Sequence, residues 1–134
     1  MKIYIAAPYT SNPEQNTQRV LKVANQLIEK GYTPVIPHLY HYLHLTFPHD
    51  YEIWQRLGWE LLEGCDIVLR LGGESPGADQ EVQHAHKHGI TVFSNGDNDL
   101  LDDLFEFLTF REWYCKKYPH HLAQKKAFSF NSVI

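Results

Sequence analysis

The chain lacks the sequence features of a membrane protein or of a disulfide-stabilised protein. Its 134 residues contain no apolar run near the roughly 20 residues that span a bilayer. The first apolar stretch is only about five residues long, which is too short for a secretory leader and typical of a first strand. Two cysteines, Cys65 and Cys115, without a CxxC pair, predict reduced thiols. We therefore expect a cytoplasmic protein without a membrane partner.

Motifs for common cofactors are also missing. No GxGxxG follows the first strand and no GxxxxGK[ST] occurs, which disfavours a dinucleotide site and a P-loop. Among nine histidines, His84 and His88 have the i, i+4 spacing that can chelate a metal. No HExxH motif or cysteine cluster accompanies them, and they fall at the far end of their helix, away from the ligand edge. We therefore expect no metal and no other cofactor, with a histidine-based metalloprotein as the weakest alternative.

Charge is unevenly distributed along the chain. There are 12 Lys and Arg and 16 Asp and Glu residues, a net charge of −4. Residues 1–110 carry −8 and residues 111–134 carry +4. An acidic body is a poor surface for a nucleic-acid polymer, so we expect no such partner. We predict one domain over residues 1–115 and a basic tail over residues 116–134.

Strand-like and helix-like segments alternate without hairpin signals. Short β-branched and aromatic runs predict strands over 2–7, 33–37, 66–71 and 90–93. Apolar residues at helical spacing predict helices over 13–30, 51–63, 78–88 and 98–114, and a turn or two of helix within the loop 38–48. The alternation is typical of βαβ units. We predict an α/β fold, a three-layer sandwich around a small parallel sheet.

In such a sheet, ligands bind beyond the carboxyl ends of the strands. The loop over residues 72–78, after the third strand, is the most informative segment at that edge. Its glycines permit close approach of a ligand, and the helix that follows favours an anion through its N–H groups and dipole. Ser75 adds a hydroxyl donor. Glu81 then falls in the first turn, where the dipole should keep it ionised as a nucleophile requires, although acids are common there for the same electrostatic reason.

Four segments together carry a resemblance to a known family: Ile3–Thr10, Gly31–Leu39, Trp59–Asp66 and Gly73–Val82. In this order they resemble the nucleoside 2-deoxyribosyltransferase-like superfamily over residues 2–95, in particular a small bacterial and phage branch related to nucleoside 5′-monophosphate N-glycosidases. The resemblance implies a Rossmann-like fold. It also implies an enzyme that hydrolyses or exchanges the N-glycosidic bond of a nucleotide or deoxynucleotide.

The resemblance further implies roles for single residues. Glu81 would attack the anomeric carbon and form a covalent glycosyl-enzyme, which water or a second base then resolves. Ser75 stands where the monophosphate hydrolases bind phosphate and the transferases carry an Asp, which favours a nucleotide as substrate. The substrate-binding residues that we expect are Tyr9, Thr10, His38, Ser75, Gly77 and Asp79.

One position departs from the family pattern. Gly58 stands where many members carry an Asp that contacts the base, so protonation by that Asp is not available. His38 or His41 could supply the proton instead, with Asp50 as a weaker substitute. The departure also motivates an alternative function, in which the same pocket binds or senses a nucleotide-derived ligand without turning it over.

Aromatic residues suggest further contacts. Trp54 could stack on a base, although core packing is the favoured interpretation. The last predicted helix carries more aromatic surface than one helix can hide in a small domain, which predicts a subunit interface and a homo-oligomer, a dimer or tetramer. Its aromatic residues are Phe105, Phe107, Phe110, Trp113 and Tyr114.

Overall fold

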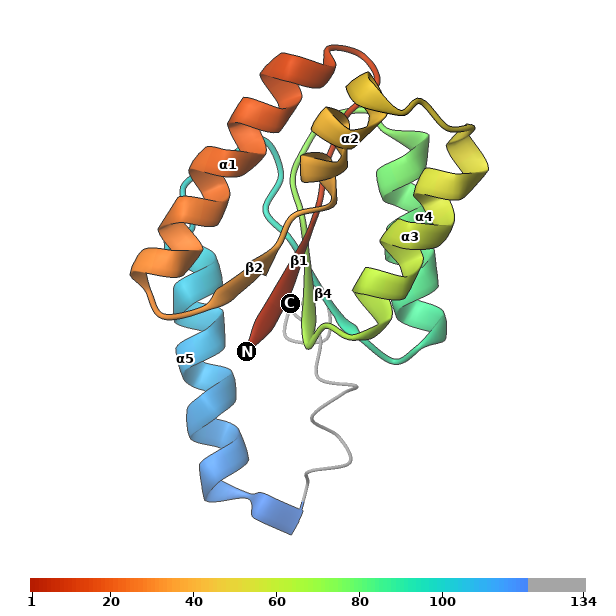
Figure 1. Cartoon of the computed structure of the whole chain (residues 1–134). Helices are drawn as coiled ribbons and strands as arrows, with labels where there is room; N and C mark the ends of the chain where they lie inside the picture. The colour runs from red at the N-terminus through yellow and green to blue at the C-terminus, as the bar shows by residue number, and fades with distance from the viewer. Residues whose placement is uncertain (121–134) are drawn as a thin grey trace.

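A computed structural model describes residues 1–120 of the chain. Its centre is a sheet of four parallel strands in the order β2-β1-β3-β4 (Figure 1). The strands are β1 (Lys2–Ala6), β2 (Thr33–Val35), β3 (Ile67–Arg70) and β4 (Thr91–Ser94). The α-helices are α1 (Pro13–Glu29), α2 (Tyr40–Thr46), α3 (Tyr51–Glu63), α4 (Pro76–Lys87) and α5 (Asp102–Lys117). The predicted α/β class and parallel sheet are confirmed.

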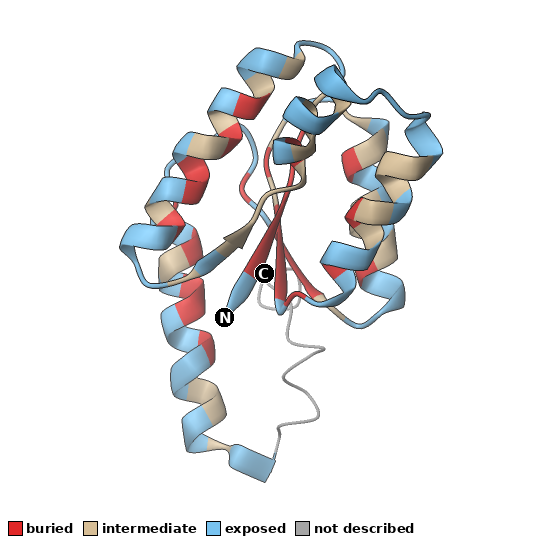
Figure 2. Ribbon diagram, viewed as in Figure 1, coloured by how far each residue is buried: buried red, intermediate tan, exposed pale blue. Residues whose placement is uncertain are grey.

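Helices cover both faces of the sheet. Figure 1 shows α1 and α5 on one side and α3 and α4 on the other, with α2 near the carboxyl ends of the strands. Side chains alternate between the two faces, so that Ile3 and Ile5 pack with α1 and α5, whereas Tyr4 and Ala6 pack toward α3 and α4. The strands β1, β3 and β4 are accordingly among the most buried parts of the chain, whereas the edge strand β2 has no buried residue (Figure 2). These three layers are the predicted sandwich.

The caps explain where the helices begin. The Asn12 side chain accepts the backbone N–H of Gln15, and Pro13 takes the first position of α1, as predicted. Ser75 caps α4 in the same way through Ala78 N, so α4 begins at Pro76, two residues earlier than predicted. Glu81 therefore lies in the second turn of α4, and its placement in the first turn was wrong.

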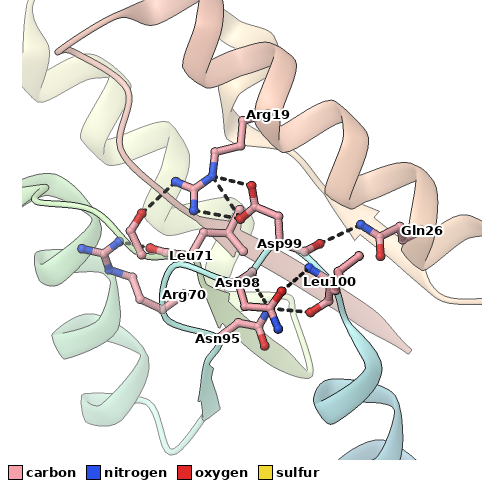
Figure 3. A network of polar contacts seen from close by, with 9 residues as sticks. Arg19, Gln26, Arg70, Leu71, Asn95, Asn98, Asp99 and Leu100 are labelled. Atoms are coloured by element: carbon pink, nitrogen blue, oxygen red, sulfur yellow. Dashed lines mark hydrogen bonds and ion pairs between the residues drawn. The ribbon is translucent and has the colours of Figure 1, made fainter.

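Helix α5 begins later than predicted, because residues 95–101 form a loop that side-chain hydrogen bonds hold in place. The Asn95 amide donates to the backbone carbonyls of Asn98 and Leu100, and Asn98 accepts from the Leu100 N–H. The Asp99 carboxylate accepts from Arg19 of α1 (Figure 3). These side-chain bonds compete with helix formation, so α5 begins only at Asp102.

The aromatic residues of α5 divide into two groups. Phe107 is buried in the core, and Phe105 stacks on Tyr32 with 6.1 Å between ring centroids. Phe110 and Trp113 remain exposed, at 43% and 51%. These two are the most exposed of the five residues predicted to form a subunit interface, and Tyr114 beside them is partly exposed, with its ring 6.3 Å from that of Phe110. The predicted tail lies mostly outside the described residues, and no described helix is long and apolar enough to cross a membrane.

Candidate active site

A cavity of about 630 Å³ opens at the carboxyl edge of the sheet. It lies beside β1 and the start of α4, the helix that follows β3. In the strand order β2-β1-β3-β4 the chain changes direction between β1 and β3, and open α/β sheets bind ligands at such a switch point. The polar residues lining it are Tyr4, Tyr9, Thr10, His38, Tyr40, His41, His44, His49, Tyr51, Gln55, Ser75, Gln80 and Glu81, joined by Trp54 and Trp59.

Glu81 projects from α4 into this cavity, and burial governs its chemistry. Its Oε2 atom is inaccessible to solvent and has no hydrogen-bond partner among the described residues. Desolvation raises the pKa of Glu81 from 4.5 to about 7, against the smaller opposing effects of a hydrogen bond from Tyr4 and the charge of Arg70. The expectation that the helix dipole keeps Glu81 fully ionised was therefore wrong: at neutral pH the protonated and ionised forms coexist. Burial exceeds the dipole because the carboxyl lies in the second turn, beyond the strongest part of the dipole field.

Tyr4 is a site residue that sequence reasoning took only as part of the strand core. Its hydroxyl donates a hydrogen bond to the Glu81 carboxylate. Burial, reinforced by the negative charge of Glu81, raises the pKa of Tyr4 well above its usual value, so the hydroxyl keeps its proton. Gly58 leaves room for it, because a Cβ at residue 58 would lie 3.1 Å from the Tyr4 hydroxyl oxygen. The glycine at residue 58, which replaces the Asp of the family pattern, thus leaves the space that the Tyr4 hydroxyl occupies.

His38 and Tyr9 form the wall contributed by the loops after β1 and β2. His38 is buried, and its Nε2 lies 3.0 Å from the Pro8 carbonyl oxygen, so Nε2 carries the proton. Burial lowers the pKa of His38. His38 is therefore neutral at pH 7, and its Nδ1, which no other residue of the 1–120 span contacts by a hydrogen bond, is an acceptor. This geometry disfavours His38 as a proton donor, whereas the His41 Nδ1 lies 2.7 Å from the Tyr9 hydroxyl.

The loop before α4 forms a further part of the cavity. Ser75 and Gly77 line it, and a Cβ at residue 77 would lie 3.1 Å from the Tyr51 hydroxyl. Asp79, by contrast, does not line the cavity: its carboxylate is exposed and pairs with Arg70 at 3.0 Å. Of the predicted substrate-binding residues, Asp79 alone lies outside the cavity. The helical phase turns its side chain away, because residues 79 and 81 are two positions apart and do not share a face.

Aromatic and histidine rings form the remaining wall, and one of them, Trp54, was expected to pack in the core. Trp54 is half-buried and lines the cavity, and its Nε1 donates to His44 Nδ1 at 2.8 Å. Its ring also contacts the rings of Tyr40 and His49. The core interpretation of Trp54 was therefore wrong. The signal that could have found this wall is the concentration of rings over residues 38–54, directly after the second strand.

Known structures share this architecture. One is the CMP N-glycosidase BcmB of Clostridium botulinum, with 19% identity, 70% of each chain covered and a TM-score of 0.52. Another is a 2-deoxyribosyltransferase of Leishmania mexicana, with 18% identity, 72% of this chain and 65% of that chain covered, and a TM-score of 0.57. At these identities the likeness establishes the fold. No curated protein matches the chain significantly.

The chain therefore shares the fold of this N-glycosidase and this 2-deoxyribosyltransferase. Residues 1–95 match the model of a domain of unknown function, DUF7768, and the chain belongs to that family. The matched span contains the whole cavity lining, since the last lining residue is Glu81. The helix α5 lies outside it.

Proposed function

We propose that the chain cleaves the N-glycosidic bond of a nucleoside 5′-monophosphate, with Glu81 as the nucleophile. The observation that carries this proposal is that three residues lining one cavity each have a buried polar atom with no hydrogen-bond partner among residues 1–120. These atoms are Glu81 Oε2, His38 Nδ1 and Trp59 Nε1. Buried polar atoms are nearly always hydrogen-bonded, so three exceptions around one space are typical of a site that a polar ligand completes. The cavity volume of about 630 Å³ suits a small molecule.

In the proposed reaction the ionised Glu81 carboxylate donates an electron pair to the anomeric carbon. The bond from that carbon to the base breaks, its electron pair goes to the base nitrogen, and the base takes up a proton. A glycosyl ester on Glu81 results. Water then attacks the same carbon, the bond from that carbon to the Glu81 oxygen breaks, and one proton of the water passes to the group that protonated the base, which releases the sugar phosphate and restores the carboxylate. A second base in place of water would give exchange.

Tyr4 would orient the carboxylate and stabilise it when it leaves the sugar, since its hydroxyl already donates to Glu81. His41, paired with Tyr9, is the proposed proton donor to the leaving base, because the geometry of His38 disfavours it for that role. The aromatic wall of Tyr40 and Trp54 would take the base by stacking.

A phosphate would lie at the start of α4. No lysine or arginine is among the described residues that line the cavity, so recognition of an anion would rest on the Ser75 hydroxyl and on backbone N–H groups at the helix start. Ser75 Oγ accepts from Ala78 N at 3.1 Å, and its own proton stays available to a phosphate oxygen.

The test is a screen of nucleosides and their 5′-monophosphates for base release by chromatography. Glu81→Gln should lower the rate at least a hundredfold while the circular dichroism spectrum is retained, and Glu60→Gln on the exposed face of α3 should leave the rate unchanged. Because only the ionised form attacks, the wild-type rate should rise with pH through about 7. Full activity in Glu81→Gln would disprove the proposal.

Gly58 favours a second candidate, a module that binds a nucleotide without turnover, because no carboxylic acid stands at this position. Calorimetry with each nucleotide, followed by chromatography of the same mixture, separates the two functions. Saturable binding without free base would favour the binding module.

A further inference from the structure

Three metal-ligating side chains converge at the other end of α3 and α4, outside the cavity that holds Glu81. Glu63 is the last residue of α3, His84 lies in the last turns of α4, and His88 caps that helix. Their ligand atoms lie within 4.8 Å of one another. Glu63 Oε1 is 2.8 Å from His84 Nε2 and 3.6 Å from His88 Nε2. One carboxylate oxygen thus faces two imidazole nitrogens from a neighbouring helix.

These distances are close to the distance between two ligand atoms that bind the same metal ion. Zinc binds imidazole nitrogen and carboxylate oxygen at about 2.0–2.2 Å, so two ligands of a tetrahedral ion lie about 3.3 Å apart. The two distances from Glu63, 2.8 and 3.6 Å, lie on either side of that value. Small side-chain rotations would therefore place one ion in contact with all three groups.

The orientation of His88 fixes the nitrogen that it presents. Its Nδ1 lies 3.0 Å from the backbone carbonyl oxygen of His84, so Nδ1 carries the proton and donates it. The lone pair is then on Nε2, the atom that faces Glu63. A hydrogen bond from the second ring nitrogen to a carbonyl is the arrangement that orients histidine ligands of metals.

Packing holds His84 in place as well. Its ring lies between the ring of Trp59, at 4.5 Å and nearly parallel, and the ring of His88, at 4.3 Å. The His84 side chain is 14% exposed, whereas those of Glu63 and His88 are 42% and 45% exposed. His84 is thus held by packing, whereas Glu63 and His88 are open to solvent. An ion can therefore enter from the solvent side, and water can complete its coordination.

We propose that Glu63, His84 and His88 form a binding site for one divalent transition-metal ion of the zinc class, with water as the fourth ligand. The ion joins the ends of α3 and α4, because Glu63 belongs to one helix and the histidines to the other. Trp59 both lines the catalytic cavity and stacks on His84, so the ion also stiffens one wall of that cavity. Two imidazoles and one carboxylate favour zinc and its neighbours over magnesium or calcium.

The test is calorimetric titration of zinc chloride into the full chain without an affinity tag. Saturable binding of one ion per chain, a rise in melting temperature with zinc and no response to magnesium are expected. His88→Ala and Glu63→Gln, both at exposed positions, should each weaken binding at least tenfold while keeping the fold by circular dichroism. His86→Ala is the matched control, since this exposed histidine of the same helix is not part of the cluster, and it should bind zinc like the wild type.

Several outcomes would overturn this inference. They are absence of saturable zinc binding, unchanged affinity in both His88→Ala and Glu63→Gln, and loss of binding in His44→Ala, which alters the histidine wall of the catalytic cavity instead. The readout is affinity and melting temperature, not base release, so the result is independent of the proposed reaction.

Discussion

Replacing Glu81 by glutamine should stabilise the fold at alkaline pH, even though it removes the proposed nucleophile. Glutamine keeps the shape of the side chain and an oxygen that can accept the Tyr4 hydrogen bond, but it never ionises. In the wild type, burial raises the pKa of Glu81 from 4.5 to about 7, so the folded state resists the charge that the unfolded chain accepts readily. Ionisation of Glu81 therefore opposes folding.

The size of the effect follows from linkage. Stability from the protonated Glu81 is fully present below pH 4.5 and is lost as pH rises through about 7. At about 1.4 kcal/mol for each pKa unit, the loss approaches about 3 kcal/mol above pH 8. For a chain of this length, this corresponds to about 10 °C in melting temperature. The difference in unfolding free energy between Glu81→Gln and wild type should thus grow from less than about 1 kcal/mol at pH 5 to about 3 kcal/mol at pH 8.5.

The assay is urea denaturation of both proteins at half-unit steps from pH 5 to pH 9. Glu60→Gln serves as control, because its carboxylate is 62% exposed and pairs with Arg56 on the surface at 3.6 Å. It should change the free energy of unfolding by less than about 1 kcal/mol at any pH. A difference between Glu81→Gln and wild type that does not depend on pH, or a glutamine variant that is the less stable protein at pH 8.5, would refute the reasoning.

Three further predictions concern the loops around the site. Arg19→Ala should lower the unfolding free energy by about 1–2 kcal/mol in urea denaturation, because it removes the bonds to Asp99 and to the Gly72 carbonyl oxygen; an unchanged midpoint would contradict this. Gly72→Ala should cost at least about 2 kcal/mol, because its Cβ would overlap the backbone that follows β4, whereas Gly64→Ala, with its nearest atom at 3.7 Å, is the mild control in the same assay. His38 should be neutral at pH 7 with its proton on Nε2, as nitrogen NMR can measure, and a charged ring at that pH would disprove the assignment.

The local signals of the sequence predicted most of the fold. The bounds of α3 agree with the apolar spacing over residues 51–63, and the cap of α1 follows from Asn12, Pro13 and Gln15. Prediction was less accurate at the start of α5, where side-chain bonds hold the preceding loop. The loop before α5 depends on Asn95 and on the pairing of Asp99 with Arg19, which are 80 residues apart, so no local pattern reveals it.

The residues of the candidate site also differ in whether the sequence alone indicates them. Glu81 and Ser75 stand out in the sequence because a glycine-containing loop precedes a helix at the carboxyl edge of a strand. Tyr4 does not, since an aromatic residue within a strand is ordinarily core, and only the packing of β1 against α4 brings its hydroxyl to the carboxylate. Glu63 likewise joins His84 and His88 only through the contact between two helices.

The sequence by itself determined the order of strands and helices along the chain, the parallel sheet and the edge at which the cavity opens, because these follow from periodicity, capping residues and the geometry of βαβ units. The tertiary structure alone decided the protonation of the site. Burial raises the pKa of Glu81 and lowers that of His38, and burial depends on contacts between residues far apart in the chain. The helix dipole alone would keep the Glu81 carboxylate charged, whereas burial in the cavity raises its pKa to about 7.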